Sequence, residues 1–357
     1  MATLRIPGAV DPHVHLRDLD WAHKATVERE TAAAIAGGYW AVLDMPNTPP
    51  NTVTAERLRA KYEHVAARAR CDFGLYMGAD QDGDGSEYAA GAPQAIGLKM
   101  YCDHTTGSLL LPDDEARRRH LRAWGAVTDK PVAVHAEGDT LAAVLRSVRE
   151  TGVRVHFCHV SLASEIELLR EGKADGLPIS VGVTPHHLYL EAADRERLGG
   201  FAMVKPPLKT TADREALWAA VLDGTVDTIE SDHAPHTRAE KESQDPPFGL
   251  PGLETTVPLT VTAMRERGLT EARLVELLAA NAQRIFGLAP PAETYTLVET
   301  GSSYVISDDQ LLCSSGWSPY SGMRVWGSVR EVRIRGRVVY DGEQVLAQPG
   351  DGRRLPS

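Results

Sequence analysis

Short apolar segments recur along the first 230 residues, and helix-length amphipathic segments lie between most of them. The expected strands are Ala9–Val14, Ala41–Met45, Phe73–Gly78, Ile96–Tyr101, Val132–His135, Val155–Val160, Ile179–Val183 and Thr228–Ser231. Strands that are apolar throughout and alternate with helices are typical of a parallel sheet covered by helices. Eight such units without a dinucleotide-binding glycine motif predict a distorted (β/α)8 barrel, an α/β fold of the TIM-barrel type.

The end of the chain has a different pattern. Residues 291–357 contain β-rich runs, such as 304–306 and 332–340, that are separated by glycine and serine. Alternating runs of this length predict short strands of an antiparallel sheet. We therefore expect a catalytic barrel over residues 1–290 and a small β-rich C-terminal appendage over residues 291–357.

Composition limits the partners and the compartment. The 357 residues carry a net charge of −11, which argues against nucleic acid or an anionic membrane as the main partner. The four cysteines have no closely spaced pair, which favours a reducing compartment. Neither a leader peptide after Met1 nor an apolar run of about 20 residues is evident. These features predict a cytoplasmic protein that acts on a small molecule.

Residues of metal-ligand type stand at the carboxyl ends of five expected strands, where barrel enzymes carry their catalytic groups. They are His13, His15, Lys99, His135, His159 and Asp232. A single buried histidine is usually structural, and a lysine in a strand can simply reach solvent. Five such strand ends together predict a metal site, and four histidines with one aspartate suit two ions better than one. These ligands suit zinc, and geometry alone does not exclude Mn or Co. Lys99 is the anomaly, because an ammonium group has no lone pair.

Several longer motifs carry a resemblance. They are Asp11-Pro12-His13-Val14-His15-Leu16-Arg17-Asp18, Met45-Pro46-Asn47-Thr48, Gly97-Leu98-Lys99-Met100-Tyr101, Val134-His135-Ala136-Glu137, Cys158-His159-Val160, Pro185-His186-His187-Leu188, Ser231-Asp232-His233-Ala234-Pro235-His236 and Pro251-Gly252-Leu253-Glu254-Thr255. In this order they resemble the dihydroorotases of the amidohydrolase superfamily, above all the type found as a domain of the animal multifunctional pyrimidine-synthesis protein. The similarity runs over nearly the whole chain.

The resemblance explains the lysine. In that family the matching lysine is carboxylated by CO2 and becomes a bridging ligand. The implied cofactors are two Zn²⁺ ions bridged by carboxylated Lys99. One ion would be held by His13, His15 and Asp232, and the other by His135 and His159.

The resemblance also implies a zinc-dependent hydrolase that interconverts L-dihydroorotate and N-carbamoyl-L-aspartate in pyrimidine biosynthesis. Asp232 would move the proton between the water nucleophile and the ring nitrogen, and Thr105, on a mobile loop, would contact the substrate. The other implied substrate-binding residues are Arg17, Asn47, Lys205, His236 and, through its backbone, Gly249. A guanidinium can bind a carboxylate with two parallel hydrogen bonds, which suits Arg17.

Three positions depart from the animal-type domain. Thr106 replaces an aromatic residue, so we expect loop closure to be weaker or differently organised. Lys205 replaces an arginine and loses its planar donor pair. Gly182 replaces a glutamate that helps to hold an additional zinc, so we expect two ions despite the nearby Cys158. His186 and His187 are expected to have structural or supporting roles.

Two alternatives stay open. The first is a related cyclic amidohydrolase, such as a hydantoinase, dihydropyrimidinase or allantoinase, whose substrate has no ring carboxylate. Arg17, Asn47 and His236 together argue against it. The second is an inactive dihydroorotase-like scaffold for aspartate transcarbamoylase, which the complete set of ligands argues against. An active homodimer, alone or in complex with aspartate transcarbamoylase, agrees with the same residues.

Overall fold

The computed structural model describes residues 3–356; Met1, Ala2 and Ser357 lie outside the described residues, including the start of the segment in which no leader is predicted. The strands are β1 (Thr3–Ile6), β2 (Val10–Val14), β3 (Ala41–Asp44), β4 (Asp72–Leu75), β5 (Met77–Gly78), β6 (Leu98–Tyr101), β7 (Val132–His135), β8 (Val155–Phe157), β9 (Ile179–Val183), β10 (Thr228–Ile229), β11 (Tyr295–Val305), β12 (Arg324–Ile334) and β13 (Arg337–Tyr340). The longer helices are α1 (Val27–Ala36), α2 (Ala55–Ala66), α4 (Asp114–Gly125), α5 (Asp139–Thr151), α6 (Ala163–Ala174), α9 (Thr211–Asp223) and α11 (Leu253–Glu266). The shorter ones are α3 (Tyr88–Gly91), α7 (Pro185–Tyr189), α8 (Asp194–Leu198), α10 (Arg238–Lys241), α12 (Glu271–Val275) and α13 (Asn281–Phe286).

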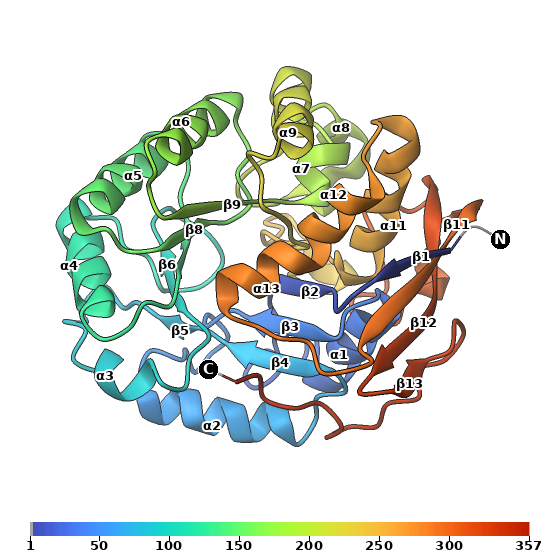
Figure 1. Ribbon diagram of the computed structural model, residues 1–357, viewed down its shortest axis with the longest axis horizontal. Coiled ribbons are helices and arrows are strands. Elements are labelled where there is room, and N and C mark those ends of the chain that lie inside the picture. Colours follow the sequence, from blue (N-terminus) through green and yellow to red (C-terminus); the bar gives the residue numbers. More distant parts are fainter. Residues whose placement is uncertain (1–2, 357) are drawn as a thin grey trace.

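The parallel strands follow one another around a ring, as the barrel prediction requires (Figure 1). One sheet has the order β2-β3-β4 and the other the order β10-β9-β8-β7-β6-β5. Only Tyr76 separates β4 from β5, and a parallel bridge between Val14 and His233 joins β2 to the residues after β10. The two sheets together therefore form a distorted (β/α)8 barrel.

Helices α2 to α6 lie along the outer edge of this ring in Figure 1. Their starts are encoded locally, because polar side chains bind the free amides of the first turn. Thr26, Thr54 and Asp113 accept hydrogen bonds from the amides of Arg29, Arg57 and Ala116 at the starts of α1, α2 and α4. The alternation read from the sequence is thus confirmed at the level of whole elements.

Several expected strands are one or two residues longer than those observed, and two differ more. The segment Phe73–Gly78 forms β4 and β5, which belong to different sheets. The expected strand Val155–Val160 ends at Phe157, because His159 has a left-handed backbone with φ 37°. Neither the break between the two sheets nor the backbone of His159 leaves a mark in the hydrophobic pattern.

The β-rich appendage is a four-stranded antiparallel sheet with the order β1-β11-β12-β13. Its first strand comes from the start of the chain, since Thr3 to Ile6 pair with Glu299 to Thr296. The end of the chain returns to the barrel, where Arg354 forms a parallel bridge with Phe73. The barrel and the appendage therefore exchange segments at both ends of the chain.

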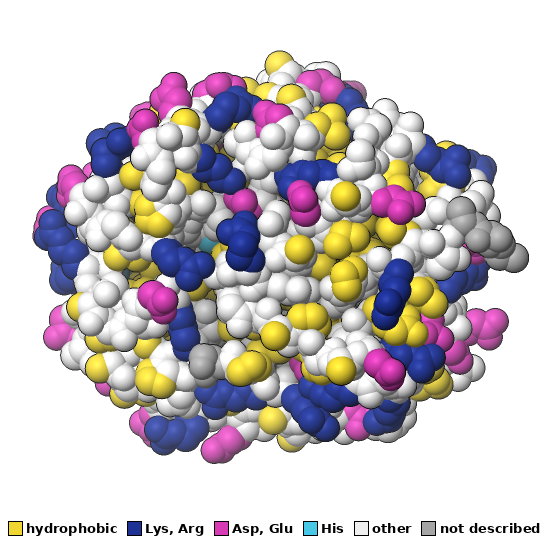
Figure 2. Space-filling view, in the orientation of Figure 1, with side chains coloured by type: hydrophobic (Ala, Val, Ile, Leu, Met, Phe, Trp, Pro, Cys, Tyr) yellow, Lys and Arg dark blue, Asp and Glu magenta, His cyan; other side chains and the backbone are white. Residues whose placement is uncertain are grey.

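Two apolar clusters stabilise this arrangement. The large one fills the barrel and the space below its helices, and a smaller one joins the 190–208 segment to the appendage through residues such as Val204, Ile306 and Trp317. Within residues 3–356, no helix combines the length and the apolar character that a membrane crossing needs. On the face drawn in Figure 2, basic and acidic side chains intermingle, and neither sign forms a continuous area.

Candidate active site

The predicted ligands meet at one rim of the barrel because the parallel strands end level with one another. Tyr101, at the end of β6, pairs in register with His135, at the end of β7. His159 and Asp232 follow β8 and β10, and both have positive φ, 37° and 45°. Residues other than glycine rarely adopt this backbone, and such outliers gather at functional sites.

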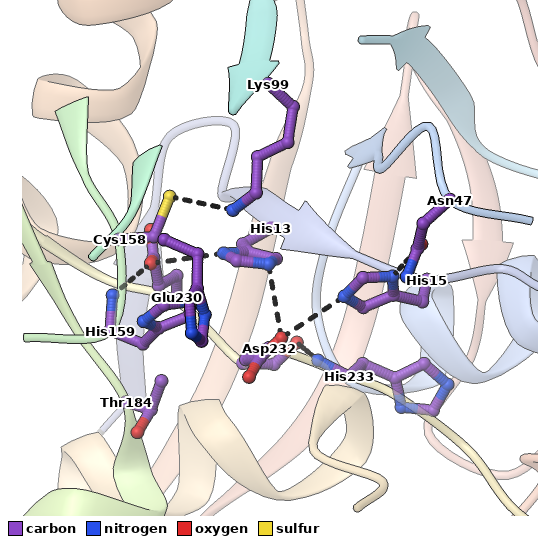
Figure 3. A network of polar contacts seen from close by, with 12 residues as sticks. His13, His15, Asn47, Lys99, Cys158, His159, Thr184, Glu230, Asp232 and His233 are labelled. Carbon is purple, nitrogen blue, oxygen red and sulfur yellow. Dashed lines mark hydrogen bonds and ion pairs between the residues drawn. The ribbon is translucent and has the colours of Figure 1, made fainter. Parts of the chain in front are cut away.

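Figure 3 shows the side chains converging on Asp232. Its Oδ1 lies 3.2 Å from His13 Nε2 and 3.4 Å from His15 Nε2. Ligand atoms of His13, His159 and Asp232 all lie within 4.8 Å of one another. Three ligand atoms at such separations can share one metal ion.

His135 and His159 form the second part of the cluster. His135 Nδ1 lies 3.1 Å from His159 Nε2. His159 Nδ1 has no hydrogen-bond partner among the described residues, and His135 Nε2 lies 3.5 Å from Glu137 Oε1. Burial is the main cause that lowers the pKa values of His13, His15 and His159 far below their usual range. Neutral imidazoles with buried, unpartnered nitrogens are what a divalent metal ion requires.

Lys99 lies among these histidines, completely buried. Its Nζ lies 3.5 Å from Cys158 Sγ, and no carboxylate of residues 3–356 forms an ion pair with it. An unpaired buried ammonium beside imidazoles is unfavourable, whereas a carboxylated lysine would be a ligand. The surroundings therefore fit the modified side chain better than the free amine.

A further carboxylate, which the sequence reasoning missed, supports the cluster. Glu230, at the start of the Glu-Ser-Asp segment, is fully buried, and its Oε1 lies 2.8 Å from the amide of His159 and 3.4 Å from His13 Nδ1. A Cβ at Gly182 would lie 2.5 Å from its Oε2, so the glycine makes room for it. Gly182 on β9 has no side chain to offer, and Glu230, the residue after β10, supplies a carboxylate at this place.

Glu230 also forms a second potential ligand group with His13 and Cys158. Burial raises the pKa of the Cys158 thiol, which opposes its use as a thiolate ligand. The expectation of two ions stays a prediction, but the argument from Gly182 alone is weaker than the sequence indicated.

The pocket beside the cluster is small, with a cavity volume of about 20 Å³. Most of the predicted site residues line it, together with Tyr101, Ala234 and Phe248: His13, His15, Arg17, Asn47, Thr105, Thr106, His135, His159, Lys205, Asp232 and Gly249. Burial raises the pKa of Asp232 to about 7. A bound cation would lower it again.

Arg17 enters the pocket from a left-handed turn, not from the strand itself. Arg17, Asp18 and Leu19 have φ of 59°, 66° and 50°, and the Asp18 carboxylate accepts hydrogen bonds from Leu19 N and Val27 N. The Arg17 side chain is buried, and its Nε and Nη1 have no partner among the described residues. Two free guanidinium nitrogens at a pocket wall are suited to bind a carboxylate.

His236 lies behind Arg17 and does not line the pocket. Its Nε2 is 3.4 Å from an Arg17 nitrogen and 2.9 Å from the carbonyl oxygen of Phe248, and Lys24 Nζ is 3.2 Å from its Nδ1. Because an ammonium only donates, Nδ1 accepts and Nε2 carries the hydrogen, which it donates to Phe248 O. Lys24 also forms an ion pair with Glu240. The sequence did not predict that these two residues orient His236.

The loop after β6 crosses the mouth of the pocket. Asn47 Nδ2 donates to the carbonyl oxygen of Thr106 at 2.9 Å, and Thr106 Oγ1 donates to Phe248 O at 3.0 Å. Asn47 Oδ1 also lies 2.8 Å from His15 Nδ1. Hydrogen bonds through Thr106 thus tie this loop to Asn47 and to Phe248 without an aromatic residue. Thr105 lines the pocket beside it.

Lys205 lies over the ring of Phe248, with its Nζ 5.4 Å from the ring centre. Gly249 has φ 130°, and a Cβ there would lie 2.6 Å from the carbonyl oxygen of Ala234. His187 bonds to Thr184 Oγ1 and Pro206 O, in line with the expected structural role, whereas both ring nitrogens of His186 lack partners among the described residues.

Comparisons with known proteins identify the family of the chain. A family model described as Dihydro-orotase-like matches residues 2–100. The chain is 33% identical to the dihydroorotase of Halobacterium salinarum over 98% of this chain and 89% of that protein. It is 38% identical to the multifunctional protein CAD of Squalus acanthias over 98% of this chain, which spans only 15% of that protein. It likewise spans 16% of the multifunctional protein pyr1-3 of Dictyostelium discoideum, at 39% identity.

Solved structures share the fold. An L-hydantoinase (dihydropyrimidinase) from Arthrobacter aurescens has a TM-score of 0.93 and 25% identity, with 99% of this chain and 89% of that chain covered. The inactive dihydroorotase-like domain of a Chaetomium thermophilum CAD-like multifunctional protein has a TM-score of 0.81 and 23% identity, with 99% of each chain covered.

Proposed function

Since the chain belongs to the dihydroorotase family, we propose that it interconverts L-dihydroorotate and N-carbamoyl-L-aspartate as an enzyme of pyrimidine biosynthesis. Arg17 is the observation that carries the proposal. Its free Nε and Nη1 are buried beside the ligand cluster, so a substrate held there has a carboxylate. Hydantoin and dihydrouracil have no such group.

The residues fit two Zn²⁺ ions bridged by carboxylated Lys99. His13, His15 and Asp232 would hold one ion, and His135 and His159 the other. Bound ions of this kind polarise a carbonyl oxygen and make a water molecule more acidic. Burial lowers the pKa values of His13 and His159, and the Nδ1 of His159 has no partner among the described residues; both observations support this assignment.

The chain's own side chains would do the remaining work. Arg17 and Asn47 would orient the substrate carboxylate, with His236 acting from behind Arg17, and Lys205 and the Gly249 backbone would contact the ring. Asp232, which lines the pocket, would accept the proton of the attacking water and deliver it to the departing ring nitrogen. Thr105 and Thr106 would keep bulk water out while the ring opens or closes.

We further propose that residues 1–290 carry the chemistry and residues 291–357 support them. The four cysteines are all buried and unpaired, which supports a reducing cytoplasm. Self-association as a homodimer and a complex with aspartate transcarbamoylase are proposals that chromatography of the purified protein, alone and mixed with that enzyme, tests directly.

The decisive experiment measures ring opening of L-dihydroorotate by ultraviolet absorbance, with the zinc content determined on the same protein. Turnover with close to two zinc ions per chain that disappears after chelation is the expected result. Turnover of hydantoin or dihydrouracil but not of dihydroorotate would replace this proposal by the cyclic-amidohydrolase alternative. A protein without metal and without turnover of any of the three would be the inactive scaffold.

A further inference from the structure

Lys241, the last residue of α10, is a buried lysine that the mechanism does not use; it is 1% exposed. Its Nζ donates to the carbonyl oxygens of Met203 at 3.0 Å, Pro247 at 2.8 Å and Gly249 at 2.8 Å. No carboxylate of residues 3–356 forms an ion pair with it, and the neighbouring Glu240 pairs with Lys24 instead. The ammonium is therefore held by three backbone carbonyls.

Two of these carbonyls belong to the turn at residues 246–249, one wall of the pocket. Phe248 and Gly249 of this turn line the pocket. Gly249 N donates to Met203 O at 2.9 Å, the same oxygen that accepts from Lys241. One ammonium thus ties the turn to the segment that leads to Lys205, another pocket residue.

The intervening carbonyl, Phe248 O, faces the other way. It accepts hydrogen bonds from His236 Nε2 and Thr106 Oγ1. The carbonyls at 247 and 249 thus bond to Lys241 on one side, and the carbonyl at 248 bonds to the site residues on the other. Each of the three successive peptide groups has its direction fixed by a side chain.

Stability alone does not explain a lysine at this place. Burial lowers the pKa of Lys241 to about 7, so the folded protein holds the charge at a penalty. An apolar side chain of similar volume is often as stable as a buried charge, or more so. An ammonium, however, has three N–H donors, one for each carbonyl, and a neutral amine has only two.

We propose that Lys241 is a positioning residue for the substrate, which fixes the 246–249 turn so that Phe248 and Gly249 keep their places in the pocket wall. This inference rests on the proposed function, because the substrate it names is the one proposed above. The hydrogen bonds that define the turn do not depend on it. Because the turn contacts the substrate before and during the reaction, its disorder weakens binding more than it slows the chemical step.

The test compares Lys241→Met with Lys130→Met in the full-length protein. Lys130 is a matched control, because its Nζ also donates to two backbone carbonyls, Ala92 O at 2.7 Å and Ala95 O at 2.8 Å, at the opposite end of the barrel. We expect Lys241→Met to raise KM for L-dihydroorotate about 10-fold with kcat within about twofold, as for loss of a charged hydrogen bond. We expect Lys130→Met to leave KM unchanged.

Hydrogen exchange measured by mass spectrometry gives a second reading without substrate. Exchange at residues 246–250 should become faster in Lys241→Met, while β6 and β7 keep their protection. If that variant does not fold, Lys241→Gln, which keeps a neutral donor, carries the same expectations. Unchanged KM and unchanged exchange in the folded variant would overturn the inference. Wild-type protein that does not turn over dihydroorotate would instead refute the proposed function and leave the exchange test intact.

Discussion

The two walls of the pocket are built in different ways. The metal-ligand wall, with His13, Lys99, His135 and Asp232, stands on or next to parallel strands whose register places it. The substrate wall, with Arg17, Thr106 and Gly249, stands on loops, and side chains bonded to backbone carbonyls and amides place it. Buried nitrogens without hydrogen-bond partners occur in both walls, His159 Nδ1 beside the ligands and Arg17 Nε and Nη1 beside the substrate pocket.

This difference predicts two kinds of failure. A change in the strand wall should remove metal and stop the chemical step, since the remaining ligands cannot move to compensate. A change in the loop wall should leave metal and kcat nearly intact and weaken substrate binding. A loop-wall variant that loses metal, or a strand-wall variant that changes only KM, would show that the two walls act as one unit.

Lys99→Ala should have the largest effect. Without the bridging group, the histidines hold their ions weakly, and metal assistance worth several kcal/mol is lost, so kcat/KM should fall at least about 10³-fold. Steady-state kinetics and zinc analysis on the same sample measure both losses. Lys99→Arg, which keeps a positive charge but cannot be carboxylated, should fail equally. Full activity with two ions in either variant would show that Lys99 is not the bridge.

Arg17→Met tests the loop wall next. It removes the charged donors to the substrate carboxylate, and such hydrogen bonds contribute about 1.5–3 kcal/mol, so KM should rise roughly 10- to 150-fold. Zinc content should stay at the wild-type value. The matched control is Arg170→Met, because Arg170 pairs with Glu167 and Asp223 on the surface. An unchanged KM in Arg17→Met would favour a substrate without a carboxylate.

Glu230→Gln tests how the strand wall is supported. The neutral amide keeps the size of the side chain but no longer holds the His13 ring and the His159 amide with a charge. We expect zinc affinity to fall about 10- to 100-fold, as for other residues that orient metal ligands. Titration with a competing chelator measures this change. Loss of one ion out of three in both Glu230→Gln and Cys158→Ser would contradict the two-ion prediction.

Thr106→Val should have the smallest effect. It removes the hydrogen bond to Phe248 O but keeps the shape of the side chain, and one neutral hydrogen bond contributes about 1 kcal/mol. KM should rise about fivefold with kcat and zinc content unchanged. Thr105→Val serves as a comparison on the same loop. A large fall in kcat for Thr106→Val would mean that loop closure limits the chemical step.

The same division explains what could be predicted from the sequence. His135 could be predicted as a site residue because it ends a strand, and the strand ends of a barrel share one rim. Glu230 was missed because its importance depends on the missing side chain of Gly182, on the neighbouring strand. Lys241 was missed because its partners are backbone carbonyls at residues 203, 247 and 249, which leave no side-chain pattern. The order of the strands predicts the metal-ligand wall, and motif resemblance predicted Arg17, Thr105 and Gly249 of the loop wall. The hydrogen bonds that hold the loop wall in place could be found only in the structure.

The positive φ angles of His159 and Asp232 have a consequence for the history of such chains. Each conformation costs about 1–3 kcal/mol for a residue other than glycine. A copy of this gene released from selection for catalysis would gain stability by exchanging these two residues for glycine or, at position 159, asparagine. Loss of activity in such a copy would therefore make the folded protein more stable, and the first substitutions would remove metal ligands.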